Sequence, residues 1–210
     1  DIYSAPDLSK LTLLLFNTRA AIFSEKAVRQ AIAYGLDRQR LIEVALGGQG
    51  LRADGPVPPA SWAYKADLPK YEYRPEAARA LLEAAGWTEG KDGAREREST
   101  PLSFILLTND KPLRLRTAEE IARQLATIGI RVTVQTAGWS DFVQDFLVPR
   151  KFQAVLTEQW SPNFDPDGYP FWHSSQIANG LNFASWTNRR ADEVLENARR
   201  SADEQVRLAL

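Results

Sequence analysis

Residues 102–136, LSFILLTNDKPLRLRTAEEIARQLATIGIRVTVQT, contain the pattern that decides the fold. Leu102–Leu107 is a short apolar run of strand length. The residues after it predict a helix from about Leu113 to Ile128, with Gly129 as its stop. Residues 130–136 then alternate apolar and polar side chains, as a half-buried strand does. This strand–helix–strand order favours an α/β architecture.

The flanking sequence continues the alternation of strands and helices. The further elements that we expect are a strand at Leu11–Phe16, a helix capped by Ser24 and running to Leu36, a helix at Arg38–Leu46 capped by Asp37, a helix starting at Pro75, a helix after Ser140, a strand at Phe152–Leu156, a helix from about Arg190 to Arg199, and a helix capped by Ser201. Because strands alternate with helices, at least part of the sheet is expected to be parallel.

Three stretches show no helical or strand period. Residues 49–74 and 158–188 are rich in proline and aromatic side chains, and long loops of this kind are often functional. Residues 88–100, TEGKDGAREREST, are polar and charged, and they predict an exposed charged loop.

Composition excludes several classes of protein. The 26 basic and 27 acidic side chains give a formal charge of −1, without the basic patch that nucleic-acid-binding or anionic-membrane-binding proteins usually carry. Because the chain has no cysteine and a single histidine, His173, it lacks the residues for disulfides and for a catalytic zinc site. No dinucleotide or P-loop fingerprint is present, so no cofactor or metal is expected.

Two short motifs could carry chemistry. His173 precedes Ser174 and Ser175, but neighbouring residues seldom face each other productively and no orienting carboxylate can be named, so we expect a packed or ligand-lining imidazole and no catalytic residue. Asp165 and Asp167 flank a proline without the terminal Glu of a calcium loop. They therefore predict either an Asx-stabilised turn or polar groups aimed at a ligand.

Tryptophan is the most informative residue type. Five of the six tryptophans lie in or beside loops, at positions 62, 139, 160, 172 and 186. Each alone is more typical of a core. Several of them at one edge of an α/β sheet would form a wall for a ligand, because ligands bind in the loops at sheet ends.

Several segments together resemble the bacterial extracellular solute-binding proteins of family 5, the peptide, nickel and oligosaccharide receptors of ABC importers. The segments that carry the resemblance are Ala27–Arg38 (AVRQAIAYGLDR), Pro58–Tyr64 (PPASWAY), Tyr73–Trp87 (YRPEAARALLEAAGW), Ala118–Ile130 (AEEIARQLATIGI), Trp160–Pro166 (WSPNFDP) and Asn182–Asp192 (NFASWTNRRAD). They occur in the order of the family and cover about residues 15–210.

The resemblance implies a periplasmic-binding-protein-like lobe, with a mixed sheet flanked by helices. Residues 1–210 would form a single lobe, the C-terminal ligand-binding lobe of a longer two-lobe receptor. It implies a non-enzymatic substrate-binding component of an ABC importer, which binds an oligopeptide or dipeptide between the lobes by hinge closure and meets the transporter permease. The location would be extracytoplasmic, and a lipid anchor on a preceding N-terminal segment is left open.

The resemblance also implies ligand-binding residues: Trp160, Asn163, Asp165 and Asp167, with Trp62 and Trp186 as weaker contacts. In peptide-binding members an Asp pairs with the α-ammonium of the peptide, and here Asn163 stands at that place without a charge. Asp165 or Asp167 could take over this role. Otherwise the ligand end is neutral, which also suits an oligosaccharide stacked on tryptophan. Lys111 and Arg114 are loose candidates for a carboxylate anchor.

Two functions of other classes stay open at this point. A hydrolase would need a nucleophile–base pair, for which a broad ester and peptide substrate screen is the test. A structural or sensor module would keep the same fold, and ligand binding by the full-length protein would distinguish it.

Overall fold

The computed structural model describes residues 10–59, 61–160 and 166–210, with the side chains of Gln159 and Trp160 left aside. The chain divides into two compact units. The larger comprises Leu13–Arg52 and Lys70–Thr157, and the smaller takes 10–12, Ala53–Pro69 and Glu158–Leu210. That residues 1–210 form a single lobe stays a prediction.

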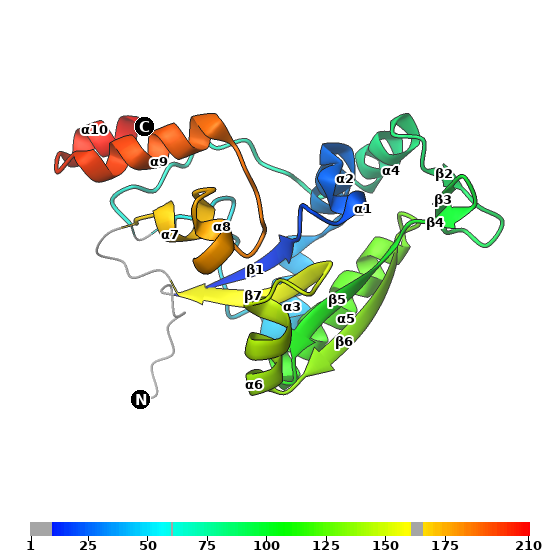
Figure 1. Cartoon of the computed structure of the whole chain (residues 1–210). Helices are drawn as coiled ribbons and strands as arrows, with labels where there is room; N and C mark the ends of the chain where they lie inside the picture. Colours follow the sequence, from blue (N-terminus) through cyan, green and yellow to red (C-terminus); the bar gives the residue numbers. More distant parts are fainter. Residues whose placement is uncertain (1–9, 60, 161–165) are drawn as a thin grey trace. The chain divides into compact units, whose positions relative to one another are not determined.

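A four-stranded sheet organises the larger unit (Figure 1). The strand order is β1-β7-β5-β6, formed by β1 (Lys10–Phe16), β7 (Ala154–Trp160), β5 (Ser103–Asn109) and β6 (Arg131–Ala137). β5 pairs in parallel with both β6 and β7. β1 runs antiparallel to β7. Asn17 directly follows β1, and its N–H donates to the carbonyl of Gln153, directly before β7, at 2.9 Å. The end of β1 therefore lies beside the start of β7. The predicted mixed α/β sheet is therefore confirmed.

Helices cover one face of this sheet. They are α1 (Ala21–Ser24), α2 (Lys26–Gly35), α3 (Arg38–Leu46), α4 (Pro75–Ala84) and α5 (Pro112–Ala126). The core contains Phe104 and Leu106 of β5, which alternate to the same face, together with Ile32, Leu82 and Leu125 of three helices. Burying each such side chain stabilises the fold by roughly 1.5–3 kcal/mol, so this layer holds the unit together.

Local signals explain where most of these helices begin and end. The Asp37 side chain accepts from the Arg40 N–H at 2.9 Å, and Gly47 ends α3 in the left-handed region, as the sequence predicts. The predicted cap at Ser24 is wrong. Its hydroxyl instead donates back to the Ala21 carbonyl at 2.7 Å, and the chain is extended at Glu25 before α2 begins.

Residues 88–100 form a small antiparallel sheet of β2 (Thr88–Glu89), β3 (Arg95–Arg97) and β4 (Thr100–Pro101). Most of its side chains are exposed, and the segment forms strands where the sequence predicts a loop. Arg95 differs, because it is only 5% exposed. Its Nη1 donates to the Trp87 carbonyl at 2.6 Å and its Nε to the Ile128 carbonyl at 3.2 Å.

The opposite face of the main sheet is partly covered by α6 (Trp139–Asp141) and the π-helical segment η1 (Phe142–Leu147). The Val148 N–H donates to the Val143 carbonyl five residues earlier. In such a turn, residues five apart share a face, and Phe142 and Leu147 are accordingly both buried. The sequence predicts an α-helix after Ser140 and misses this wider turn.

The smaller unit contains four helices among its described residues. They are α7 (Tyr169–Trp172), α8 (Gln176–Asn179), α9 (Arg189–Arg200) and α10 (Glu204–Ala209). Asn188 caps α9. The predicted cap at Ser201 is wrong, since Asp203 accepts from the Gln205 and Val206 N–H groups and caps α10. Nowhere in the described ranges is a helix long and apolar enough to cross a membrane.

Candidate functional site

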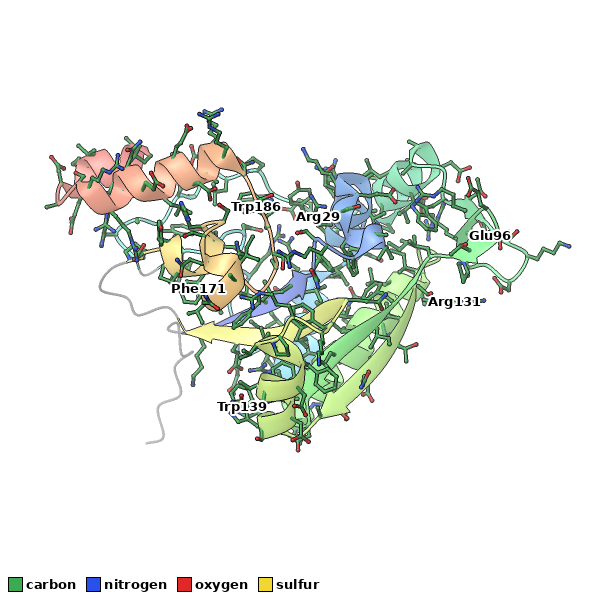
Figure 2. All side chains as sticks on the ribbon, in the orientation of Figure 1. Arg29, Glu96, Arg131, Trp139, Phe171 and Trp186 are labelled. Carbon is green, nitrogen blue, oxygen red and sulfur yellow. The ribbon has the colours of Figure 1, made fainter. Side chains whose placement is uncertain are left out.

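Trp139 marks the carboxyl-terminal edge of the parallel strands in the larger unit (Figure 2). It follows the end of β6 by two residues and begins α6. Its ring stacks on Phe142 with centroids 5.8 Å apart and an interplanar angle of 24°. Phe142 is fully buried, whereas 57% of Trp139 is exposed. Trp139 thus packs on a buried ring and remains exposed at the edge where α/β sheets bind ligands.

Asn109 ends the central strand β5 at the same edge. It is fully buried, and neither its Oδ1 nor its Nδ2 has a hydrogen-bond partner among the described residues. The preceding Thr108 is also buried, but its hydroxyl donates a hydrogen bond to the Leu156 carbonyl at 3.0 Å. A buried amide with no partner is costly, so proteins seldom carry one without a reason. No periodicity or motif singled out Asn109.

The two loose candidates for a carboxylate anchor differ in access. Arg114 is only 4% exposed, on the first turn of α5. Lys111 is exposed and stands just before Pro112, where its side chain makes no capping bond. Because a ligand must reach its anchor, Lys111 is the better placed of the two.

Asp167 is held within the smaller unit. Its Oδ2 accepts from Arg199 Nη2 at 2.6 Å and Nε at 2.9 Å, and its Oδ1 accepts from the Tyr169 N–H at 3.0 Å. The last bond is the Asx turn that the sequence left as one alternative. Burial raises the pKa of Asp167, but the bonds from Arg199 and Tyr169 outweigh burial and leave the pKa below its ordinary value.

Tyr169 joins Arg199 to the single histidine. The Arg199 guanidinium lies 3.9 Å from the centroid of the Tyr169 ring. The same ring stacks on the His173 imidazole, with centroids 4.1 Å apart and an interplanar angle of 17°. This arrangement links α7 to α9 through one aromatic ring.

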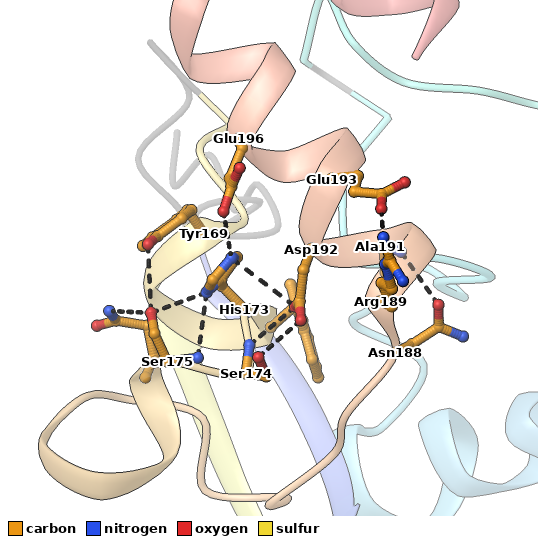
Figure 3. Close-up of polar contacts among 12 residues, drawn as sticks. Tyr169, His173, Ser174, Ser175, Asn188, Arg189, Ala191, Asp192, Glu193 and Glu196 are labelled. Carbon is orange, nitrogen blue, oxygen red and sulfur yellow. Dashed lines mark hydrogen bonds and ion pairs between the residues drawn. The ribbon is translucent and has the colours of Figure 1, made fainter.

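His173 is the centre of a polar network (Figure 3). The Ser175 N–H donates to Nδ1 of His173 at 3.1 Å, so Nδ1 carries the lone pair and Nε2 carries the proton. Nε2 lies 3.3 Å from Oε1 of Glu196 and donates to it. Asp192 accepts from the N–H and the hydroxyl of Ser174. Burial raises the pKa of Asp192, but the bonds from Ser174 and the nearby His173 leave it lowered. The network fixes α7 and α8 on α9.

The Ser175 hydroxyl also lies 2.8 Å from His173 Nδ1, so these two near neighbours do meet. The arrangement with Glu196 has the order of a hydrolytic triad. Two features disfavour catalysis. The Nδ1 lone pair already accepts from a backbone N–H. In addition, the N–H groups of Gln176 and Ile177 donate to the His173 and Ser174 carbonyls, so they are not available to an oxyanion.

The other predicted contacts are only partly placed. Asn163 and Asp165 lie outside the described residues, as does the side chain of Trp160. Trp62 is half-buried, with the Arg207 guanidinium 5.1 Å from its ring centroid. Trp186 is half-buried, and its backbone is held by the buried Asn182 side chain.

The groove beside η1 gives no further small-molecule site, and the acidic side chains give no metal site, within the described ranges. A groove of about 240 Å³ lies over the middle of β5 and against η1. It is below the roughly 300–1,000 Å³ of small-molecule sites. Among the same residues, no group of three or more histidine, aspartate or glutamate side chains could hold a metal ion.

Known proteins resemble this chain over most of its length. Residues 3–180 match the model of the bacterial extracellular solute-binding proteins, family 5 middle region. The chain is 35% identical over 192 residues to the oligopeptide-binding protein AppA of Bacillus subtilis, which covers 90% of this chain and 35% of that protein. It is 34% identical over 191 residues to heme-binding protein A of Haemophilus influenzae, covering 88% of this chain and 33% of that protein.

The fold is shared as well. The structure of Bacillus subtilis AppA in complex with a nonapeptide superposes with a TM-score of 0.90 at 34% identity, over 97% of this chain and 41% of that one. The chain therefore spans about a third of the length of the curated relatives that it matches.

Proposed function

The chain belongs to the bacterial extracellular solute-binding proteins of family 5, and from that premise we propose that it forms one wall of a peptide-binding site in a receptor of an ABC importer. The full receptor binds its peptide by hinge closure and presents the closed form to the permease. It works outside the cytoplasm and is not an enzyme.

The single observation that carries the proposal is the exposed ring of Trp139. An indole fixed on Phe142 offers a flat apolar face at little entropic cost, which suits the side chains and backbone of an extended peptide. The relative AppA, whose structure contains a nonapeptide, supports a peptide over other ligands.

We assign the remaining contacts by their position in the sequence. Trp160 ends β7, and Asn163 and Asp165 follow it in the sequence. Trp62 and Trp186 stay weaker candidates, since both are half-buried. Closure excludes water from such a site, which strengthens each polar contact to the peptide.

Native mass spectrometry of the full-length protein, purified from its host, tests the ligand class. We expect co-purifying peptides, which would be identified after release. An oligosaccharide would instead support the sugar-binding alternative. A haem, identified by its mass and absorbance, would place the protein with its haem-binding relative.

A matched pair of variants tests the wall itself. Trp139→Ala in the full-length protein should weaken binding of the identified peptide about tenfold or more, because a central aromatic contact is lost. Tyr73→Ala is the control, since Tyr73 is 45% exposed and precedes α4, which contributes no residue to the proposed site. Equal affinities of the two variants, measured by calorimetry, would remove Trp139 from the site.

A further inference from the structure

The carboxyl end of β5 is the topological switch point of the main sheet. From β5 the chain crosses through α5 to β6 on one side, and from β6 it returns through α6 and η1 to β7 on the other side of β5. Leu106 of β5 packs in the core with Leu125 of α5. Leu107, on the other face of β5, lines the groove with Phe146 of η1. The two connections thus diverge to opposite faces, and ligands of α/β sheets bind in the crevice at such a point.

A polar run occupies the switch point. Asn109 ends β5, and Asp110 and Lys111 lead from it into α5. The buried Asn109 amide has no partner in the described part of the chain, so the protein keeps a polar group here at a cost in stability. The Asp110 N–H donates to the Ala137 carbonyl at 3.1 Å, which fixes Asp110 beside the end of β6. Trp139 begins α6 two residues after Ala137, so the polar run and the exposed indole belong to the same edge.

The Asp110 carboxylate is available to a ligand. Its side chain is exposed, and it makes no hydrogen bond or ion pair with any residue that the structure describes. Asp is a favoured residue for capping a helix, yet the Asp110 side chain makes no bond to the first turn of α5, and Lys111 at the cap position makes none either. All the acceptor positions of this carboxylate are therefore open to a donor from outside the chain.

Asp167, a carboxylate that the sequence suggests for the same role, is engaged within the smaller unit. A carboxylate offers about four acceptor positions, and donors from Arg199 and Tyr169 occupy three of them. A ligand cation would have to displace Arg199 before it could bind. Of these two carboxylates, Asp110 is therefore the better suited to receive a cation.

We infer that Asp110 is a specificity-determining residue, which binds a cationic group of the peptide at the edge that Trp139 marks. The group is the α-ammonium or the charged end of a basic side chain, since both form charge-assisted hydrogen bonds with a carboxylate. Trp139 favours the same charge, because the face of an indole attracts cations. The inference rests on the proposed function and deepens it, since it names the chemical group that one residue of the wall selects.

Binding of three synthetic nonapeptide libraries to the full-length protein tests the inference, with the retained peptides quantified by mass spectrometry. The first library has a free N-terminus and no basic side chain. The second is the same mixture N-acetylated, so it carries no cation. The third is N-acetylated and contains one central arginine. The variant is Asp110→Asn. Asp141→Asn is the matched control, because Asp141 is exposed, has no side-chain partner among the described residues and lies on α6.

We expect Asp110→Asn to weaken binding of a cation-bearing library about tenfold relative to the second library, because a charge-assisted contact is lost. A selective loss of the first library identifies the α-ammonium as the bound group, and a selective loss of the third identifies a basic side chain. A poorly folded variant would lose all three libraries equally, so the ratios between libraries report the contact itself. Unchanged ratios in Asp110→Asn, or the same change in Asp141→Asn, would overturn the inference.

The wild type separates this inference from the proposed function. If it retains peptides from any library, the proposed function is supported, and the ratios in Asp110→Asn alone decide the role of Asp110. If it retains no peptide from any library, the proposed function fails, and the inference that rests on it fails as well.

Discussion

A Cβ atom added to Gly129 would lie 2.7 Å from Cγ of Arg95, although the two residues are 34 positions apart. Gly129 follows α5 and has a φ of +83°, a conformation that glycine adopts without strain. The missing side chain thus serves two purposes. It lets α5 end, and it lets β3 approach the start of β6.

Gly129→Ala should therefore destabilise the protein by about 2 kcal/mol or more, because strained backbone and a steric clash add together. Urea unfolding measures the loss. Gly93→Ala is the control, with a φ of +78° and no atom within 4 Å of the added Cβ. It should lose only the backbone part, about 1–2 kcal/mol. Equal losses of stability in the two variants would show that the Arg95 side chain moves away from the added Cβ without cost.

Arg95 should contribute more to stability than Glu83, the exposed partner in its ion pair. Arg95→Met leaves the Trp87 and Ile128 carbonyls without their donor, which we expect to cost about 2–4 kcal/mol. Glu83→Gln removes only the carboxylate, which is 61% exposed, and should cost less than about 1 kcal/mol. Thermal and urea unfolding of the two variants give the comparison. Similar losses would mean that the ion pair, and not the carbonyl bonds, holds β3.

The Glu120 carboxylate should stabilise the fold less in acid than at neutral pH. The hydrogen bond from Arg123 lowers the pKa of Glu120 below its usual 4.5, burial opposes this, and Gln124 adds to the lowering. Because the folded-state pKa is depressed, the stabilisation is fully present above about pH 4.5 and is lost as the pH falls through the folded pKa. Glu120→Gln should thus be less stable than the wild type at pH 7, by roughly 1 kcal/mol, and this gap should be smaller at pH 3.

Urea unfolding at both pH values measures that gap. Glu76→Gln is the control, because Glu76 pairs with Arg79 at the same spacing but its side chain is 84% exposed. A pH-dependent gap of the same size in both variants would show that burial of Glu120 adds nothing.

Replacing Asn109 with an apolar residue should make the protein more stable. Asn109→Val removes two buried polar atoms that have no partner in the described part of the chain, and it suits a central strand. We expect unfolding to become harder by about 1–2 kcal/mol. A less stable variant would contradict the expectation and indicate that a bound water satisfies the amide.

Local pattern predicted most of the elements, often to within one or two residues. The strand expected at 130–136 is β6 at Arg131–Ala137, and the helix expected at Arg38–Leu46 has those bounds. The misses are also local. Ser24 and Ser201 fit the residue preferences for caps, but in each case a competing hydrogen bond or the neighbouring Asp203 decided where the helix begins.

The sequence by itself determined the α/β alternation, the main helix stops and the family, because periodicity, caps and ordered motifs are properties of neighbouring residues. Only the tertiary structure decided the strand order, the burial of Asn109 and Arg114, and the partners of Asp167 and Arg95. The decisive contacts join residues far apart in the sequence: Arg199 lies 32 positions from Asp167, and Ile128 lies 33 positions from Arg95. No local pattern encodes which of many carboxylates an arginine will meet once the core has formed.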